Sequence, residues 1–335
     1  MMASSTRRVG VIDVGTNGVK ILIADVTPLE VLPVYESSTQ TRLGAGLYEK
    51  NTLRDDSILA TSIAVADHHQ RAIAHEASRV ICVATSAMRD ASNGYSLVQA
   101  IRGSCGLELV VLSGNREAEL AFKGVQTDAR LRDRELLVVD VGGGSTELIF
   151  GSSSGIRLQR SFQLGAVRLA EDFKLSDPPS RHELQSCTAR IDGFLNEQVA
   201  PVFLPVIRER ARFGPSPMIV GASGTSTVIA RMHLQTQSFD RTLIERVTLS
   251  SGEVSDLCQL IWGCSLTDRK NLPGLPHNRA DIIPFGVLIF SRLMALFESN
   301  QLCVSMRGLR FALAAELGSC NPPEDPLVSE SRASC

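Results

Sequence analysis

Two glycine turns in this chain each follow an aspartate at the end of an apolar run. The first lies in VIDVGTNGVKILIA (11–24) and the second in VVDVGGGSTELIFG (138–151). Glycine permits positive φ and leaves amide N–H groups uncovered, so that successive N–H groups can surround an anion. Asp13 and Asp140 stand where each run enters its turn. A carboxylate beside an anion is favourable when a cation lies between them, which indicates Mg²⁺ bridging to phosphate.

Each stretch taken alone is equally typical of an ordinary β-turn, with Asp13 as an Asx-turn residue that stabilises a hairpin. The repetition favours the ligand-binding interpretation, because Val, Asp, Val and Gly recur in phase in both stretches. A repeat a whole domain apart suggests two similarly built domains and not a solenoid of short units. In each copy a β-branched run, a tight turn and a second β-rich run predict a hairpin.

The rest of the sequence predicts helices that alternate with strands. In the first half we expect helices at 56–76, 95–103 and 113–125, and strands at 79–85 and 107–112. In the second half we expect a strand at 156–165, helices at 165–174, 180–199, 251–262 and 279–297, a strand, turn and helix within 218–232, and a final helix at 307–318 that packs on the first domain. This alternation predicts an α/β fold with mixed sheets.

Composition and charge argue against several classes of protein. A formal net charge of −2 over 335 residues gives no bulk attraction to nucleic acid or to a membrane surface. The eight cysteines show no metal-ligand spacing and are expected to be reduced thiols. Asp13 interrupts the first apolar run too early for a signal peptide, and the run at 282–297 is too short for a membrane span. We therefore expect a cytoplasmic protein with no nucleic-acid or membrane partner.

Eight motifs occur in the order seen in one family. They are VIDVGTNGVKILIADV, VATSAMRDASNG, LSGNREAELAFKGV, LLVVDVGGGSTELIFG, QLGAVRL, VGASGTSTVIA, LPHNRADIIPFGVLI and SMRGLRFALAAE. Over about residues 7–317 the chain resembles the exopolyphosphatase/guanosine pentaphosphate phosphohydrolase (Ppx/GppA) family of the actin-like ATPase superfamily. The resemblance implies two actin-like (ribonuclease H-like) α/β domains with the active site in the cleft between them. We expect residues 1–124 with about 300–318 to form the first domain, 125–299 the second, and 319–335 a disordered tail.

The resemblance also implies the chemistry and the residues that carry it. Family members hydrolyse a terminal phosphoanhydride bond with a divalent metal, here Mg²⁺ with Mn²⁺ as the alternative. Glu117 would orient or deprotonate the attacking water, and Arg89 would face the phosphate chain. The expected metal ligands are Asp140, Glu147 and Asp13. The residues expected to hold phosphate are Gly15, Thr16 and Asn17 in the first turn and Gly142, Gly143, Gly144 and Ser145 in the second.

Three places depart from the family pattern or stay open. Arg116 stands where many members carry a glutamate, which changes the charge beside Glu117 and could extend a basic track for the substrate. Gly18 replaces a residue that usually carries a hydroxyl, so one phosphate contact is in doubt. The stretch GASGTS (221–226) either contacts a guanine or ribose or is only a strand-to-helix turn.

The substrate expected is inorganic polyphosphate, with guanosine pentaphosphate as the alternative. A polyphosphate chain needs a basic track, whereas a guanine needs a pocket, and the chain offers little aromatic surface for stacking. The residues proposed for the track are Arg157, Arg160, Arg168, Lys174 and Arg181. A kinase of the same superfamily and a non-catalytic nucleotide-binding module remain alternative classes, and a homodimer remains open as the assembly.

Overall fold

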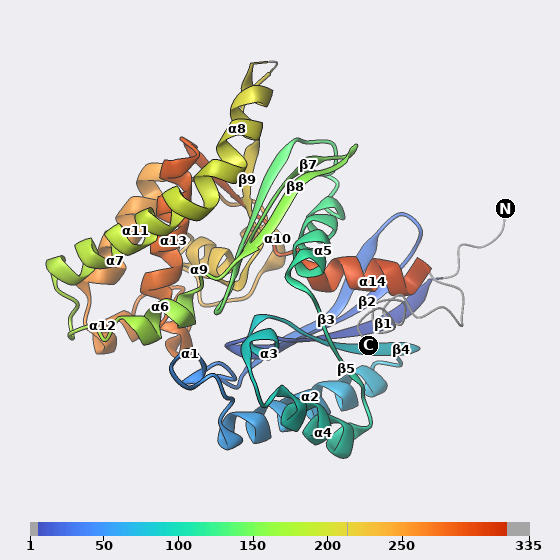
Figure 1. Cartoon of the computed structure of the whole chain (residues 1–335). Coiled ribbons are helices and arrows are strands. Elements are labelled where there is room, and N and C mark those ends of the chain that lie inside the picture. The colour runs from blue at the N-terminus through green and yellow to red at the C-terminus, as the bar shows by residue number, and fades with distance from the viewer. Residues whose placement is uncertain (1–5, 213, 320–335) are drawn as a thin grey trace. The chain divides into compact units, whose positions relative to one another are not determined.

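The computed structural model describes residues 6–212 and 214–319 (Figure 1). The described chain divides into two compact units. Unit 1 falls within residues 1–128 and 307–335, and unit 2 within 129–306. The expected disordered tail spans residues 319–335, and the structure describes only Ser319 of it. The prediction of disorder therefore lies outside the described residues. None of the described helices combines the length and the apolar character that a membrane crossing requires.

Unit 1 is built on a five-stranded mixed sheet with the order β3-β2-β1-β4-β5. The strands are β1 (Arg7–Val14), β2 (Gly18–Val26), β3 (Val31–Gln40), β4 (Arg79–Ala84) and β5 (Leu109–Val111). The first three strands pair antiparallel, and β1, β4 and β5 pair parallel. The parallel strands therefore end at a common carboxyl edge, where their loops meet.

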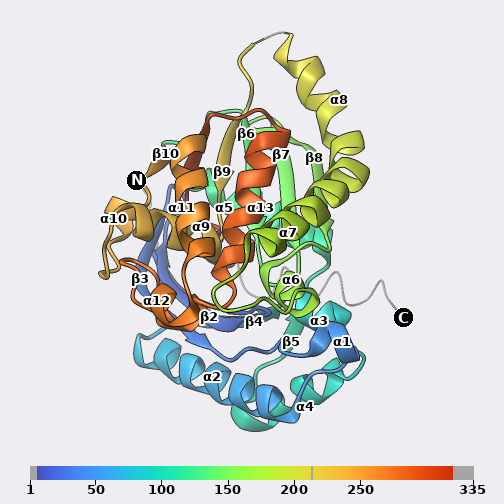
Figure 2. The same ribbon diagram turned by 90° about the vertical axis from the view of Figure 1, so that its left-hand side faces the viewer.

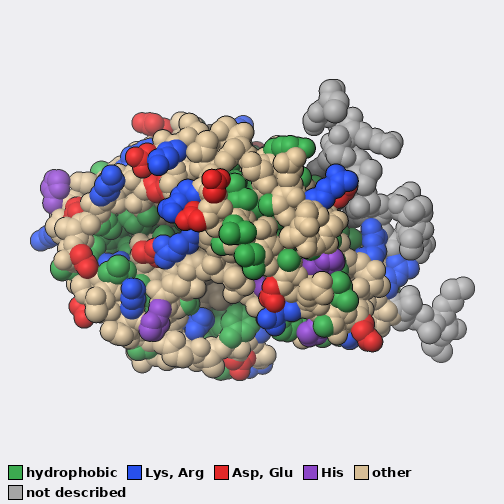
Figure 3. Space-filling view, turned by 90° about the horizontal axis from the view of Figure 1, so that it is seen from below, with side chains coloured by type: hydrophobic (Ala, Val, Ile, Leu, Met, Phe, Trp, Pro, Cys, Tyr) green, Lys and Arg blue, Asp and Glu red, His purple; other side chains and the backbone are tan. Residues whose placement is uncertain are grey.

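Helices cover both faces of this sheet. They are α1 (Leu47–Lys50), α2 (Asp55–Ala74), α3 (Ser86–Asp90), α4 (Gly94–Cys105), α5 (Gly114–Gln126) and α14 (Leu309–Ser319). One apolar cluster joins the sheet to α2 and α4, and a second joins its other face to α5 and α14. Figure 3 looks at the outer face of α2 and α4, where hydrophobic and charged side chains are mixed. Leu59 and Ile63 of α2 are exposed.

Unit 2 is built on a six-stranded mixed sheet with the order β10-β11-β9-β6-β7-β8. The strands are β6 (Leu136–Val141), β7 (Thr146–Ser152), β8 (Gly155–Phe162), β9 (Met218–Gly221), β10 (Thr248–Ser250) and β11 (Gln301–Val304). Strands β6, β9 and β11 pair parallel and the others antiparallel. The second glycine turn joins β6 to β7 at the carboxyl edge of the parallel strands.

The helices of unit 2 are more varied in kind, with a π-helix and a 3₁₀-helix among them. They are α6 (Ala166–Asp172), α7 (Arg181–Phe194), the π-helix η1 (Leu195–Val199), α8 (Ala200–Ala211), α9 (Gly224–His233), α10 (Arg241–Ile244), α11 (Ser251–Gly263), α12 (Leu266–Lys270), the 3₁₀-helix η2 (His277–Arg279) and α13 (Ile283–Leu296). Figure 2 shows α9, α11 and α13 together on one side of the sheet. The almost wholly apolar α13 is buried there, with Phe285 and Phe290 fully enclosed.

The α/β fold class and both hairpins are confirmed, one predicted helix end is wrong, and the strands β3, β10 and β11 were not expected. The helix expected to end at 199 continues through η1 into α8, because Pro201 lies in the first turn of α8, where a missing N–H costs little. Strand β3 was not expected, because Pro33 and a polar second half hide its β character. It is an edge strand, the position that tolerates proline. The expected packing of the last helix is confirmed, since α14 lies on β1 and β2.

Candidate functional site

The carboxyl edge of the unit 1 sheet brings three predicted segments together. The N–H of Thr85 donates to the carbonyl of Val14 at 3.3 Å, and the N–H of Leu112 donates to the carbonyl of Ala84 at 2.9 Å. The glycine turn after β1, helix α3 after β4 and the start of α5 after β5 therefore emerge side by side. Loops at this edge of parallel strands are the usual place for a binding site.

The first glycine turn is held from behind through its carbonyl groups. The N–H of Gly44 donates to Thr16 O at 2.8 Å, and the N–H groups of Thr41 and Arg42 both donate to Asn17 O. Within the described residues, the N–H groups of Thr16 and Asn17 donate to no protein acceptor. The turn therefore keeps two amide donors for a ligand, as the anion-binding prediction requires.

The structure explains why position 18 is a glycine. A Cβ at this position would lie 2.6 Å from the backbone carbonyl oxygen of Thr39 in β3. A serine or threonine could therefore enter only if β3 moved away. The close approach of β3 therefore explains why glycine stands at position 18. The neighbouring Asn17 is held by a separate contact, in which its Oδ1 accepts a hydrogen bond from the side-chain amide of Gln40 at 3.3 Å.

Arg89 and Glu117 form a direct ion pair. Arg89 Nη1 lies 2.6 Å from Glu117 Oε2 and also donates to the carbonyl of Leu112 at 3.0 Å. Glu117 stands in the first turn of α5, whose N-cap Ser113 accepts from the N–H of Arg116. Glu117 is only 7% exposed, so its charge is stabilised by Arg89 and by the amino end of the helix.

Arg116 lies next to Glu117 in sequence but its guanidinium group is engaged elsewhere. It contacts Glu119 Oε2 at 2.9 Å and Glu316 Oε2 at 2.6 Å, and its side chain is 12% exposed. Lys123 contacts the same two glutamates. These residues join α5 to α14. The prediction that Arg116 extends a basic track is therefore not supported by its position.

The second glycine turn repeats the arrangement of the first. The N–H groups of Val167 and Arg168 donate to Gly143 O, and Arg168 Nε donates to Gly144 O at 3.0 Å. In the described part of the chain, the N–H groups of Gly143, Gly144 and Ser145 donate to no protein acceptor. The start of α6 thus binds the carbonyl groups of the second glycine turn and leaves the N–H groups of the turn available to a ligand. The sequence alone did not show that the QLGAVRL motif has this supporting role.

Gly165 makes this contact possible. A Cβ at Gly165 would lie 2.3 Å from the carbonyl oxygen of Gly143, which no side chain could accommodate without moving the turn. The hydroxyl of Thr225 at the start of α9 also donates to the carbonyl of Val141 at 3.0 Å. The second turn is therefore fixed by two helix starts.

Asp140 and Glu147 are direct partners in the β6–β7 ladder. Opposed residues in an antiparallel pair point to the same face of the sheet, so both carboxylates lie on one face beside the glycine turn. Glu147 is buried and accepts a hydrogen bond from the hydroxyl of Ser161 at 2.7 Å, whereas Asp140 is partly exposed. Adjacent hard oxygen donors of this kind fit a divalent cation such as Mg²⁺.

Asp13 differs from its counterpart Asp140. Its ladder partner is Lys20, and burial raises the pKa of the Asp13 carboxyl, while the charges of Lys20 and Arg310 act in the opposite direction. No trio of His, Cys, Asp or Glu within residues 6–212 and 214–319 forms a protein-only metal cage. That arrangement agrees with Mg²⁺ binding through one or two carboxylates, with phosphate oxygens and water completing the shell.

The GASGTS stretch is a strand-to-helix turn in the structure. Ser223 caps α9 by accepting from the N–H of Ser226, and the Ser226 hydroxyl accepts from the N–H of Ser223. The expected basic track is only partly assembled here. Arg168 reaches the glycine turn, but Arg157 lies toward the other end of β8, 3.7 Å from Glu135.

These features define a class of protein, namely an α/β chain of two mixed-sheet units that each carry a glycine turn at the carboxyl edge of the parallel strands. The chain belongs to the Ppx/GppA phosphatase family, whose sequence model matches residues 22–316.

Named relatives and solved structures agree with this family. The chain is 31% identical over 323 residues to Exopolyphosphatase 2 of Mycobacterium tuberculosis, a match that covers 92% of this chain and 98% of the relative. An exopolyphosphatase from Cytophaga hutchinsonii matches in structure with a TM-score of 0.81 at 25% identity, covering 93% of this chain and 97% of the other. The Ppx/GppA protein of Aquifex aeolicus matches with a TM-score of 0.74 at 27% identity, over 93% and 98% of the two chains.

Proposed function

We propose that this protein is an exopolyphosphatase, which removes the terminal phosphate of inorganic polyphosphate by attack of water. The observation that carries the proposal is the pair of glycine turns, each held by its carbonyls with amides left to donate. The relatives named as exopolyphosphatases support it. Phosphoanhydride hydrolysis needs an aligned water, donors to the phosphate oxygens and charge neutralisation, and little covalent help.

We assign the residues of this chain to those tasks as follows. The amides of Thr16, Asn17, Gly143, Gly144 and Ser145 donate to phosphate oxygens. Glu117 holds the attacking water and accepts its proton, because its carboxylate is held in one orientation by Arg89 at 2.6 Å. Arg89 orients Glu117 and donates its remaining N–H groups to the phosphate that is transferred.

Asp140 would hold the divalent cation directly, with Glu147 behind it and Asp13 contributing from the first turn. Magnesium supplies neutralisation of the negative charge that develops on the leaving phosphate oxygens. We place the reaction in the cytoplasm.

A guanosine pentaphosphate 5′-phosphohydrolase is the second candidate. It is favoured by one observation, the approach of Arg279 to the backbone of the β9–α9 turn, where a Cβ on Gly224 would lie 3.1 Å from Arg279 Nη1. A guanidinium group beside a backbone turn can contact a base or a ribose. Polyphosphate stays the first candidate because the relatives named above are exopolyphosphatases.

The test measures phosphate release by the purified protein from polyphosphate and from guanosine pentaphosphate, side by side with Mg²⁺. We expect faster release from polyphosphate, with affinity for long chains that falls steeply as salt is added. Faster release from guanosine pentaphosphate with salt-insensitive handling of polyphosphate would favour the second candidate. Release from neither substrate would overturn the hydrolase assignment, and ATP consumption that requires an acceptor would indicate a kinase.

A further inference from the structure

A cavity that is partly open to solvent lies in unit 2 at the amino ends of β6 and β9, away from the glycine turn. Its volume is about 550 Å³, and its walls come from the start of these strands, the end of α8, the loop before β9, the end of α13 and the loop from α13 to β11. The two strands are fixed there, since the N–H of Met218 donates to the carbonyl of Glu135 at 3.1 Å. Strand β6 rises by about 3.3 Å per residue, so the cavity and Asp140 stand near opposite ends of a strand roughly 17 Å long.

The size and lining of this cavity are those of a small-molecule site. Ligand pockets in proteins commonly enclose about 300–1,000 Å³, with apolar walls and a few polar groups that fix orientation. The apolar wall here is formed by Leu137, Ile207, Ile219 and Phe297. The charged groups of the wall are Arg134, Glu135, Arg210 and Glu298, and its neutral polar groups are Ser216, Ser299, Asn300 and Gln301.

Arg210 presents unused donors to the cavity. Its Nε donates to Glu135 Oε1 at 2.9 Å, which fixes the plane of the guanidinium group. Within the described residues, its two terminal nitrogens donate to no protein acceptor. A guanidinium group fixed along one edge is arranged to receive an anion along the other.

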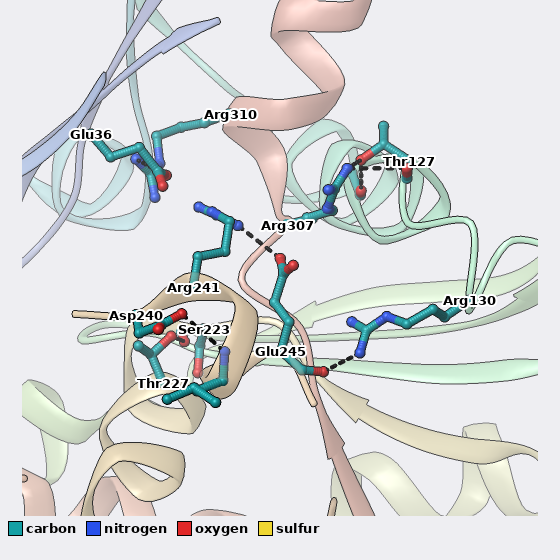
Figure 4. A network of polar contacts seen from close by, with 12 residues as sticks. Glu36, Thr127, Arg130, Ser223, Thr227, Asp240, Arg241, Glu245, Arg307 and Arg310 are labelled. Atoms are coloured by element: carbon teal, nitrogen blue, oxygen red, sulfur yellow. Dashed lines mark hydrogen bonds and ion pairs between the residues drawn. The ribbon is translucent and has the colours of Figure 1, made fainter. Parts of the chain in front are cut away.

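Arg134 supplies a second unused cation. It lines this cavity and also a smaller adjoining one of about 120 Å³. Its neighbour in the smaller cavity, Arg130, is engaged, because Arg130 Nη1 donates to the backbone carbonyl of Glu245 (Figure 4). Arg241 in turn holds the Glu245 carboxylate at 2.7 Å. By contrast, the Arg134 side chain makes no hydrogen bond or ion pair with any described residue.

One carboxylate oxygen of Glu135 in the cavity wall lacks a hydrogen-bond partner among the described residues. Its Oε2 is buried and has no hydrogen-bond partner in the part of the chain that the structure describes. Buried polar atoms in native proteins nearly always have a partner, so an unpaired one is a sign of a missing water or ligand. Because a carboxylate oxygen only accepts, a ligand that satisfies Glu135 Oε2 must carry an N–H or O–H donor beside its anionic group.

We propose that this cavity is a second ligand site of the protein, which binds a small organic anion with an apolar body. The anionic group would lie between Arg134 and the terminal nitrogens of Arg210, and the apolar body would pack on Ile207 and Phe297. This site differs from the one proposed for hydrolysis, since it occupies the opposite end of the β6 and β9 strands and needs no metal.

The experiment uses 8-anilino-1-naphthalenesulfonate as the probe, because this dye combines a sulfonate with an aromatic body. Titration of the full chain should give one saturable fluorescence increase. Arg134→Ala should weaken binding about tenfold, the effect of one lost charge-assisted contact. Ser216→Trp should abolish binding, because Ser216 lines the cavity from an exposed position where a large side chain fills the space. Arg208→Ala is the matched control on α8 and should bind as the parent does, since Arg208 does not line the cavity.

Three results would overturn the proposal. They are unchanged binding in Ser216→Trp, equal weakening in Arg134→Ala and Arg208→Ala, or displacement of the dye by saturating tripolyphosphate. The last result would put the dye in the hydrolytic site. Circular dichroism checks that each variant is folded, and if Ser216→Trp is not, the comparison of Arg134→Ala with Arg208→Ala decides. Loss of phosphatase activity has no bearing on these readings, so this proposal and the proposed function fail separately.

Discussion

Arg89 Nη1 and Glu117 Oε2 lie 2.6 Å apart, although the two residues come from different helices that follow different strands. The pair forms because β4 and β5 are adjacent and parallel, so that α3 and the start of α5 leave the sheet together. Glu117 is nearly buried and Arg89 about one-fifth exposed. The arrangement fixes the orientation of the carboxylate before any substrate arrives.

Removing the arginine should therefore destabilise the protein. Arg89→Met leaves Glu117 buried without this cation, and we expect the free energy of unfolding in urea to fall by about 3 kcal/mol, the lower end of losses for broken buried pairs. Glu117→Gln in the same background should recover part of that loss, because a neutral amide does not need the charge. Arg102→Met, on the exposed side of α4, is the control. Equal stability of the Arg89 and Arg102 variants would show that the pair contributes nothing.

Glu117→Gln keeps the shape of the side chain but cannot accept a proton. We expect the rate of phosphate release from polyphosphate to fall by about 10²–10⁴-fold, the usual cost of losing one general base. Binding of polyphosphate, measured by competition or calorimetry, should largely survive. Glu119→Gln, two residues along α5 and paired with Lys123, should keep the parent rate. A turnover near the parent value in Glu117→Gln would remove this residue from the mechanism.

Asp140→Asn should raise the Mg²⁺ concentration that gives half-maximal activity, because an amide is a poorer ligand than a carboxylate for a hard cation. The measurement is a series of rate curves against Mg²⁺ at fixed polyphosphate. Asp133→Asn, at an exposed position shortly before β6, should leave the curve unchanged. A lower maximal rate with the same metal dependence would make Asp140 a structural residue.

Arg116→Ala tests whether this residue serves the substrate or the fold. Its contacts with Glu119 and Glu316 predict a lower melting temperature, because α5 and α14 lose their bridging cation. The salt dependence of polyphosphate binding should stay as in the parent, since the guanidinium group is engaged within unit 1. A shallower salt dependence, with unchanged stability, would instead assign Arg116 to the polyphosphate track.

Glu183 gives a prediction for pH. Hydrogen bonds from the hydroxyls and backbone N–H groups of Ser176 and Ser180 lower the pKa of the Glu183 carboxyl to about 2, from an ordinary value of 4.5. A lowered pKa in the folded state stabilises the protein above pH 4.5, and that contribution disappears as the pH falls toward 2. Glu183→Gln should therefore melt below the parent at pH 7 and approach it near pH 2–3. A constant difference across this range would contradict the assignment, and Glu209→Gln on α8 is the control.

The sequence predicts those features of this structure that depend on residues close together along the chain. The hairpins around Asp13 and Asp140 were predictable, because β-branched runs and glycine turns are local signals. The start of α5 at Ser113 was likewise a local capping signal. The partners of Arg116 were not predictable, because Glu316 lies two hundred residues further along the chain. Only the packing of α14 on α5 brings those charges together.

The candidate site divides in the same way. The glycines and carboxylates could be selected from their motifs, but which groups of each turn stay available could not. That depends on Gly44 behind the first turn and on Gly165 and Arg168 behind the second, which hold the carbonyls and so turn the amides outward. Substrate choice and location in the cytoplasm stay predictions.

The order of the units along the chain has a consequence for biosynthesis. Unit 2 is continuous in sequence, whereas unit 1 is completed only by α14 at its far end. During translation the inner unit can close its sheet as soon as β11 has left the ribosome. The face of β1 and β2 that receives Phe311, Leu313 and Leu317 stays partly uncovered until α14 has been synthesised. The two units therefore complete their apolar cores at different times during translation, the inner one first.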